Sequence, residues 1–340
     1  VDAATVDGGA DCNSIAAPES TGGGLMNHLN SKVLGLATIA LMSLMLLLQL
    51  SSQDEMTESE LLLPELESKL SAVKGVGIRS LEDDTGVTLR KKDGNWIIEE
   101  KSGYPADFES LSELLNRLAE LGIAEIKTAK AEYHNKLGVE SSGQSAGTLI
   151  SIEGEETYEL IVGNEATSRG SFVRRPESDQ VYLSDAEVDV SIEPMDYLDP
   201  VIVNVDSAEG QSITVTTSGS YLSAHRNEES GEMVIQNLPD GAELKYSTVA
   251  DGLARMLINL RFTDVEVLDP GRFSSSSVAT VETTTGEIIR VETLKVEDKY
   301  WLHLNRVETA NWQYEISEYT YNELNKSMED MLKVEETDDE

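Results

Sequence analysis

Four histidines and one cysteine are the residues best suited to bind a transition metal, and their spacing is not that of a metal site. The histidines, His28, His134, His225 and His303, are far apart in the chain, and Cys12 is the only cysteine. Zinc sites use several Cys or His ligands, commonly in pairs a few residues apart. We therefore predict no metal site from these residues, and a single cysteine forms no internal disulfide.

Carboxylates offer a second kind of chemistry. Six of them lie close together in sequence: Asp185, Glu187, Asp189, Glu193, Asp196 and Asp199. Ca²⁺ takes about six to eight oxygen ligands, but this run lacks the D-x-D-x-D-G spacing of a calcium loop. We favour an acidic, solvated face, with calcium binding as the alternative. Glycoside hydrolysis also uses paired carboxylates; it would need a sugar cleft lined by aromatic side chains, and aromatics are only 5% of the chain.

The motifs that mark common enzyme classes are absent from the sequence. No G-x-S-x-G, H-E-x-x-H, Walker A or G-x-G-x-x-G pattern occurs. We interpret Tyr104-Pro105-Ala106-Asp107 as a turn followed by a helix cap, because proline fixes the turn and aspartate accepts bonds from the first N–H groups of a helix. The sequence therefore predicts no catalytic, cofactor-binding or metal-binding residue, no cofactor and no enzymatic activity.

The net charge of the chain restricts the kinds of molecule that it can bind. The 340-residue chain has 63 Asp and Glu against 26 Lys and Arg, which gives a formal net charge of −37 and a pI near 4.3. A protein of this negative charge repels the negatively charged phosphates of DNA and RNA, so we expect no nucleic-acid partner. With 39% hydrophobic residues the chain has enough apolar side chains for a packed core. The acidic surface fits either a saline habitat or a basic partner.

One apolar run dominates the sequence. Val33–Leu50 contains 18 residues without a charge. A helix of that length spans about 27 Å, close to the ~30 Å hydrocarbon core of a bilayer. The run is longer than the apolar core of a usual signal peptide, and Ser51 and Ser52 follow it rather than a small-x-small cleavage site. We predict a retained transmembrane helix, with a cleaved signal peptide as the alternative.

The basic residues near this run indicate its orientation. Lys32 directly precedes it, and the next lysine, Lys69, is too distant to weigh strongly. The positive-inside rule then places the N-terminus in the cytoplasm and the body outside. We predict a single-pass protein of the bacterial inner membrane with a periplasmic body. Residues 1–32 are either a disordered cytoplasmic tail or, as we favour, contain the true start at Met26.

Beyond this run, the apolar pattern predicts strands and a few helices. Two sets of residues each share one helix face: Leu111, Leu114, Leu115, Leu118 and Leu121, with Ser110 or Asp107 as N-cap, and Val249, Leu253, Met256, Leu257 and Leu260. Another helix is predicted from Ser317 to about Lys333, and a short one after Pro64. The predicted strands are Ile78–Leu81, Val87–Lys91, Trp96–Glu99, Ile123–Ile126, Gly147–Ile152, Tyr158–Val162, Ser171–Arg175, Val181–Leu183, Ile213–Thr217, Tyr221–His225, Met233–Gln236, Asp264–Leu268, Val278–Thr283, Glu287–Leu294, Tyr300–Arg306 and Trp312–Ile316.

The same order of elements occurs twice. The offset is 135 residues from Ile78 to Ile213, 139 from Leu121 to Leu260 and 132 from Gly154 to Gly286. We predict an α+β fold, in which an N-terminal transmembrane helix is followed by two tandem repeated antiparallel-sheet-plus-helix domains. The predicted parts are a disordered or cytoplasmic N-terminal segment (1–32), the transmembrane helix (33–50), a neck with a short amphipathic helix (51–74), the first α+β repeat (75–200), the second repeat with a C-terminal helix (201–333) and an acidic tail (334–340).

Short motifs in the first repeat carry a resemblance. In order they are Trp96, Tyr104–Asp107, Leu137-Gly138-Val139, Leu160–Gly163, Phe172–Arg174 and Val181–Leu183. Together they resemble an uncharacterised bacterial family of single-pass membrane proteins, a domain of unknown function whose genes often lie beside gliding-type auxiliary subunits of ABC-2 exporters. The resemblance is clear over residues 75–200 and looser in the second half. This chain departs from it at Lys136, where the family usually has an aromatic residue, and over Glu140–Gly147, where it has a proline.

The resemblance implies a periplasm-facing body that associates with an exporter, and it assigns no catalytic residue. We therefore expect a membrane-anchored, non-enzymatic accessory subunit that binds the membrane subunits of an ABC-type exporter. Small residues of the anchor, Gly35 and Ala37, would permit close helix packing. The alternative is an envelope module that binds polysaccharide or peptidoglycan without any transporter, and an envelope hydrolase is a third hypothesis.

Overall fold

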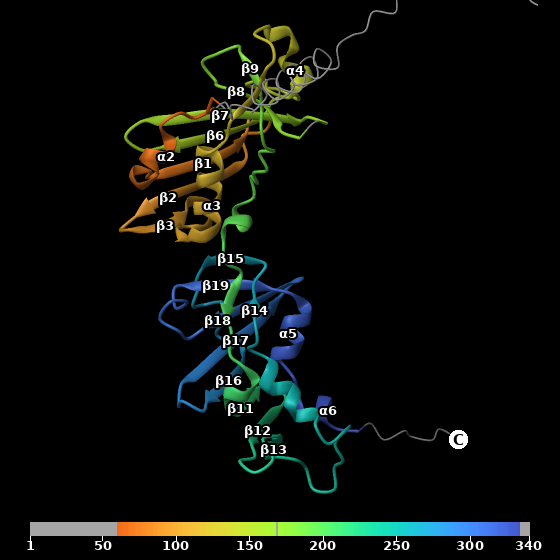
Figure 1. Ribbon diagram of the computed structural model, residues 1–340. Helices are drawn as coiled ribbons and strands as arrows, with labels where there is room; N and C mark the ends of the chain where they lie inside the picture. Colours follow the sequence, from red (N-terminus) through yellow and green to blue (C-terminus); the bar gives the residue numbers. More distant parts are fainter. Residues whose placement is uncertain (1–59, 168, 334–340) are drawn as a thin grey trace, which may run out of the picture. The chain divides into compact units, whose positions relative to one another are not determined.

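The computed structural model describes residues 60–167 and 169–333. The predicted N-terminal segment, the transmembrane helix Val33–Leu50, most of the neck and the acidic tail lie outside these residues. Within the described part of the chain, no helix is both long and apolar enough to cross a bilayer. The described residues form large antiparallel sheets with few helices (Figure 1).

Nine strands form the first sheet. They are β1 (Gly75–Ser80), β2 (Gly86–Lys92), β3 (Asn95–Ile98), β4 (Tyr104–Pro105), β5 (Ile123–Ile126), β6 (Thr148–Glu153), β7 (Thr157–Glu165), β8 (Ser171–Arg174) and β9 (Val181–Ser184). Their order is β4-β3-β2-β1-β6-β7-β8-β9-β5, and all neighbours are antiparallel. Asp93 and Gly94, both at positive φ, form the tight turn between β2 and β3, as Asp-Gly pairs do in two-residue hairpins.

Eight strands form the second sheet. They are β11 (Gly210–Thr216), β12 (Tyr221–Arg226), β13 (Met233–Ile235), β15 (Asp264–Val267), β16 (Ser277–Thr283), β17 (Ile288–Val296), β18 (Lys299–Leu304) and β19 (Trp312–Ile316). Their order is β13-β12-β11-β16-β17-β18-β19-β15. The ends of the predicted strands in both sheets lie within three residues of the observed ends. β10 (Val201–Val203) and β14 (Leu260–Arg261), which the sequence pattern did not indicate, form a separate antiparallel pair.

The two large sheets have the same connectivity. The first sheet begins with four strands joined in sequence (β1–β4) and the second with three (β11–β13). Each chain half then continues through a helical segment to a strand at the far edge and returns through four strands joined in sequence. β5 in the first sheet and β15 in the second therefore hold equivalent places, each paired with the last strand of its sheet. This equivalence allows the same corner of the two sheets to be compared residue by residue.

The helical segment differs between the two halves. α3 (Phe108–Ala119) is a regular helix that buries Leu111, Leu114 and Leu118, and Asp107 is its N-cap, accepting a hydrogen bond from the Glu109 N–H at 3.1 Å. The α-helix predicted in the second half is wrong, because residues Val249–Arg255 form a 3₁₀ helix, η6. Gly252 within this segment disfavours an α-helix.

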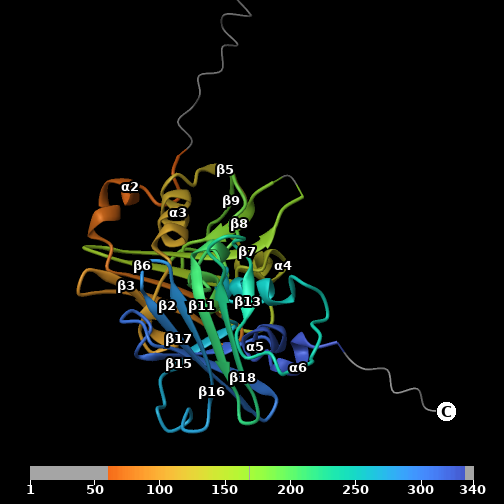
Figure 2. The same ribbon diagram turned by 90° about the horizontal axis from the view of Figure 1, so that it is seen from below.

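The C-terminal helix predicted from Ser317 to about Lys333 is also wrong, because the structure has two short helices, α5 (Glu318–Leu324) and α6 (Met328–Met331) (Figure 2). Asn325 ends α5, and its amide donates to the Tyr321 carbonyl at 2.7 Å and to Thr293 Oγ1 at 2.9 Å. Ser327 then begins α6 as the N-cap of a capping box. The short helix of the neck is α2 (Leu66–Lys69), followed by one 3₁₀ turn, η1 (Leu70–Ala72).

An aromatic cluster connects β4 with residues of the second half of the chain. The Tyr104 ring centroid lies 5.0 Å from that of Trp312 and 5.7 Å from that of Phe262, both in edge-to-face geometry. The Phe262 ring in turn lies 5.2 Å from that of the fully buried Tyr314. Such pairs contribute about 0.5–1.5 kcal/mol each beyond the area they bury.

Candidate functional site

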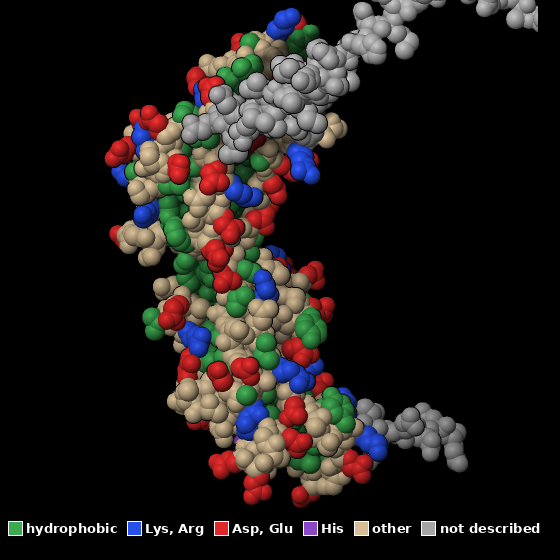
Figure 3. Space-filling model, in the orientation of Figure 1, with side chains coloured by type: hydrophobic (Ala, Val, Ile, Leu, Met, Phe, Trp, Pro, Cys, Tyr) green, Lys and Arg blue, Asp and Glu red, His purple; other side chains and the backbone are tan. Residues whose placement is uncertain are grey.

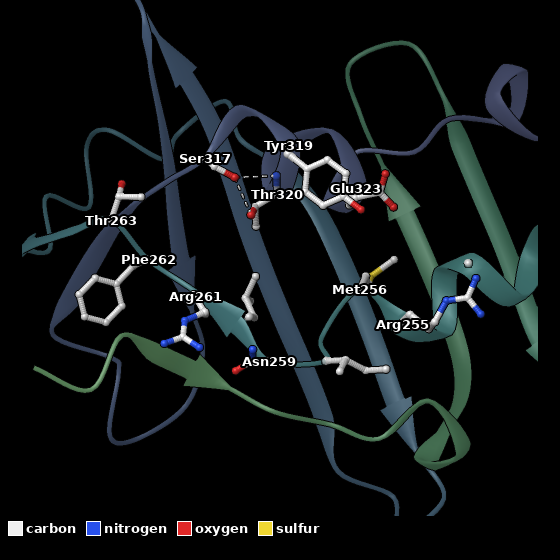
Figure 4. A pocket seen from close by; sticks show the side chains of 13 residues that line it. Arg255, Met256, Asn259, Arg261, Phe262, Thr263, Ser317, Tyr319, Thr320 and Glu323 are labelled. Atoms are coloured by element: carbon white, nitrogen blue, oxygen red, sulfur yellow. Dashed lines mark hydrogen bonds between the residues drawn. The ribbon is translucent and has the colours of Figure 1, made fainter. Parts of the chain in front are cut away.

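A cavity of 630 Å³ lies beside the second sheet, between η6, the segment around β14 and α5. It is lined by Gly252, Arg255, Met256, Ile258, Asn259, Leu260, Arg261, Phe262, Thr263, Ser317, Tyr319, Thr320 and Glu323. Figure 4 shows Arg255 and Arg261 toward opposite ends of this group, with Tyr319 and Glu323 contributed by α5. The lining therefore combines apolar, cationic and hydrogen-bonding side chains.

The cavity has an apolar floor and exposed apolar groups at its rim. Met256, Leu260 and Phe262 are buried in the core. At the rim, Tyr319 is 73% exposed and Ile258 is 42% exposed. Large apolar side chains that stay exposed beside a hollow are common at surfaces that bind partners.

Local hydrogen bonds position the walls. Ser317 is the N-cap of α5: its hydroxyl accepts a bond from the Thr320 N–H at 3.1 Å and lies 2.9 Å from Thr320 Oγ1. Asn259 adopts a left-handed conformation with φ of 48°, which Asn tolerates better than most residues. Its N–H donates to Asn204 Oδ1 at 2.8 Å, which holds the turn before β14.

The charges of this cavity differ from those of the chain as a whole. Asp and Glu side chains are spread over the face shown in Figure 3. In the cavity, neither Arg255 nor Arg261 has an ion-pair partner among the described residues, whereas the one lining carboxylate, Glu323, pairs with Lys326 at 2.8 Å. The hydrogen bond that Lys326 donates to the Glu323 carboxylate raises the pKa of the Lys326 amine. Within the described part of the chain, two cationic groups are thus left without a paired carboxylate, although the protein is strongly acidic.

The histidines do not come together. The His134 ring is buried and its Nε2 lies 2.9 Å from the Asp179 carbonyl. His225 bonds to Gln236, and His303 Nδ1 lies 3.0 Å from the Trp312 carbonyl. His28 and Cys12 lie outside the described residues. Over residues 60–167 and 169–333, no group of three or more His, Cys, Asp or Glu is placed to hold a metal ion.

The carboxylates between Asp185 and Asp199 bond mainly to nearby backbone and hydroxyl groups. Asp185 Oδ1 accepts from the Gly122 N–H at 2.9 Å, and Asp199 Oδ1 accepts from the Val201 N–H at 2.9 Å. Asp196 accepts from the Ser191 hydroxyl. Glu187 instead lies against the Glu165 carboxyl, whose hydrogen bond and negative charge raise the Glu187 pKa. These contacts order the segment that leads from the end of β9 to the start of β10.

The motifs of the first half have structural roles. The Leu137 carbonyl lies over Gly163, where an added Cβ would be 2.3 Å from its oxygen. Arg174 is only 4% exposed and binds the same loop, donating to the Val139 carbonyl at 3.0 Å and to Ser141 Oγ at 2.7 Å. This loop therefore packs directly against β7 and β8.

The sequence pattern does not predict this cavity. Helical spacing places Met256 and Leu260 on the face of a predicted helix, and no motif marks Arg255 or Arg261. The signal present in the sequence is this pair of arginines on either side of a mostly apolar run, in a chain with few basic residues.

A comparison with protein-family models matches residues 96–284 to a domain of unknown function (DUF4340). This confirms the resemblance to a family of unknown function, and the match runs across both large sheets. Searches of curated proteins and of solved structures found no match.

Proposed function

We propose, on the premise that this chain belongs to the DUF4340 family, that it is a membrane-anchored, non-enzymatic binding subunit. Its body would lie on the periplasmic side of a bacterial inner membrane and bind the membrane subunits of an ABC-type exporter. The observation that carries the proposal is the uncharged run Val33–Leu50 ahead of a body that begins at residue 60. A chain of this kind holds a binding surface near the membrane.

The side chains of the body support a binding role. His134 and Arg174, which could otherwise take part in chemistry, are buried and bonded to backbone carbonyls. Exposed apolar and cationic groups gather instead around the cavity beside α5. Tyr and Arg are enriched among residues that dominate binding energy at protein interfaces.

Crosslinking in intact membranes tests the proposed association. The full chain carries a C-terminal affinity tag, crosslinks form before solubilisation, and captured proteins are identified by mass spectrometry. A tagged, unrelated single-pass protein expressed at the same level is the control. We expect an ABC permease and its ATPase to be enriched over that control.

Two other outcomes would contradict this assignment. Enrichment of cell-wall material without any permease would favour the envelope-binding module instead. Protection of the C-terminal tag from protease in spheroplasts would contradict the periplasmic location, whichever partner is recovered.

A further inference from the structure

The corner of the first sheet where α3 meets β5 is closed by the chain itself. Leu61 pairs with Gly122, flanked by bonds from the Ile123 N–H to the Glu60 carbonyl and from the Leu62 N–H to the Leu121 carbonyl, both 2.8 Å. In this antiparallel geometry the N–H and C=O of Gly122 point away from Leu61. Asp185, directly after β9, satisfies both: its N–H donates to the Gly122 carbonyl at 3.0 Å and its Oδ1 accepts from the Gly122 N–H at 2.9 Å.

Arg261 holds the equivalent place in the second half. It pairs with Val201, and the next residue, Phe262, donates its N–H to the Pro200 carbonyl at 3.0 Å. The N–H and C=O of Arg261 therefore point away from β10, as those of Gly122 point away from Leu61. The chain after β19 enters α5 at Ser317 and makes no counterpart of the Asp185 bonds among the described residues. The cavity of 630 Å³ lies at this corner.

The segment that closes the first corner indicates what would fit the second. Residues 185–192 read Asp-Ala-Glu-Val-Asp-Val-Ser-Ile, in which polar residues, the first three of them carboxylates, alternate with small or β-branched ones. Val188, Val190 and Ile192 pack against the core, and the Val188 N–H donates to Ser171 Oγ at 3.0 Å. An extended segment with one apolar side and one acidic side therefore covers this corner in the first sheet.

Charge favours the same chemistry at the second corner. Arg255 and Arg261 line the cavity without ion-pair partners among the described residues, and Met256 and Leu260 form its apolar floor. A carboxylate that meets an uncompensated guanidinium forms a charge-assisted bond with good geometry. Figure 4 shows the two arginines at different places along the cavity, Arg255 on the η6 side and Arg261 at β14.

We propose that this cavity binds an extended acidic and apolar peptide segment of a partner polypeptide, which bonds to the backbone of Arg261 as Asp185 bonds to that of Gly122. In this binding mode an extended peptide forms hydrogen bonds with the backbone N–H and C=O of Arg261, and the side chains that line the cavity select the peptide sequence. The inference rests on the proposed function only in treating the body as a binding module. It does not depend on the partner being an exporter.

The test uses a fluorescein-labelled peptide with the sequence of residues 184–192, Ser-Asp-Ala-Glu-Val-Asp-Val-Ser-Ile. Binding to the full chain in nanodiscs of zwitterionic lipid is followed by fluorescence anisotropy. We expect saturable binding that weakens at least tenfold in the double variant Arg255→Glu and Arg261→Glu. The matched control is Arg117→Glu with Arg169→Glu, which makes the same change of charge at exposed arginines elsewhere. Circular dichroism establishes that both variants are folded.

Modified peptides separate the backbone contact from simple charge attraction. Methylation of the Asp amide at the second peptide position removes the donor that would meet the Arg261 carbonyl, and we expect at least a fivefold loss. Methylation at the Ser near the C-terminus of the peptide is the control. The proposal would be overturned if the peptide showed no saturable binding, or if both double variants lost the same affinity for it. It would also be overturned if an all-Asp peptide bound as tightly as the peptide of residues 184–192. Crosslinking to a permease is a separate result, so either proposal can fail alone.

Discussion

Replacing Arg174 by methionine tests whether one buried guanidinium holds the loop of Leu137–Ser141 on the first sheet. Its guanidinium donates to five acceptors: the carbonyls of Val139, Arg175, Pro176 and Ser178, and Ser141 Oγ, at 2.7–3.2 Å. Burial lowers the pKa of this arginine, yet an arginine side chain stays protonated in proteins. Methionine fills much of the same space but donates to none of these acceptors.

The size of the effect follows from this network. A bond from a charged donor contributes about 1.5–3 kcal/mol, and such contributions do not add fully when they share one donor group. Removing the arginine leaves neutral carbonyl and hydroxyl acceptors without this donor, and one unsatisfied buried group costs about 1–3 kcal/mol. We therefore expect Arg174→Met to lower the free energy of unfolding by about 3 kcal/mol. Arg174→Lys should lie between wild type and Arg174→Met, because lysine keeps the charge but lacks the planar fork.

Urea unfolding of the full chain in detergent micelles measures this change, and hydrogen exchange of the amides of residues 137–141 locates it. Arg169→Met is the control, since Arg169 is exposed and such substitutions change stability by less than about 0.5 kcal/mol. A loss below about 1 kcal/mol for Arg174→Met, or unchanged exchange of the loop, would refute the assignment of the loop to this arginine.

Three further substitutions test other features. Gly163→Ala should destabilise the protein by about 1–3 kcal/mol in the same urea titration, because the new Cβ would clash with the Leu137 carbonyl oxygen. Gly77→Ala is the control, because its Cβ would meet nothing within 4 Å. Tyr314→Phe should leave the free energy of unfolding unchanged or raised by up to about 1 kcal/mol, since its buried hydroxyl makes no hydrogen bond of ordinary geometry among the described residues and approaches only the Tyr104 hydroxyl. Tyr197→Phe, which removes a bond of 2.8 Å to the Ser191 carbonyl, should instead cost about 1 kcal/mol; the reverse order of the two would contradict this reading. Glu187→Gln should raise the melting temperature at pH 7 but not at pH 4. Glu165 raises the folded-state pKa of Glu187, so the folded protein loses stability as pH rises through that pKa. Equal shifts of the melting temperature at both pH values would refute this coupling.

Local pattern was sufficient for most of the strands. Alternation of apolar and polar residues predicts strands such as Val278–Thr283, and the Asp93-Gly94 pair predicts its hairpin, because both signals lie within a few residues. The leucine face of α3 and the cap at Asp107 are local in the same sense. The two halves of the chain repeat these signals in the same order, so the repeated order of elements is predictable from the sequence, and the strand orders of the two sheets agree with it.

The second helical segment shows where local pattern was insufficient. Val249, Leu253 and Leu257 have helical spacing, but the structure forms a 3₁₀ helix, with bonds such as that from the Met256 N–H to the Leu253 carbonyl. Asp251 in this segment accepts a bond from the Met233 N–H of β13 at 2.8 Å. A tertiary contact of this kind competes with the weak preference of this Gly-containing segment for the α-helical conformation.

Composition and short-range periodicity are enough to predict the acidic charge, the uncharged run Val33–Leu50 and the order of strands. The cavity is visible only in the folded chain, because Arg255 and Arg261 line it once β10, α5 and the turn at Asn259 are in place. The tertiary structure also shows that Asp185 bonds to the backbone of Gly122, whereas no described residue bonds in this way to the backbone of Arg261. These features depend on backbone groups far apart in the chain, whose hydrogen bonds are set by sheet register and not by neighbouring residues.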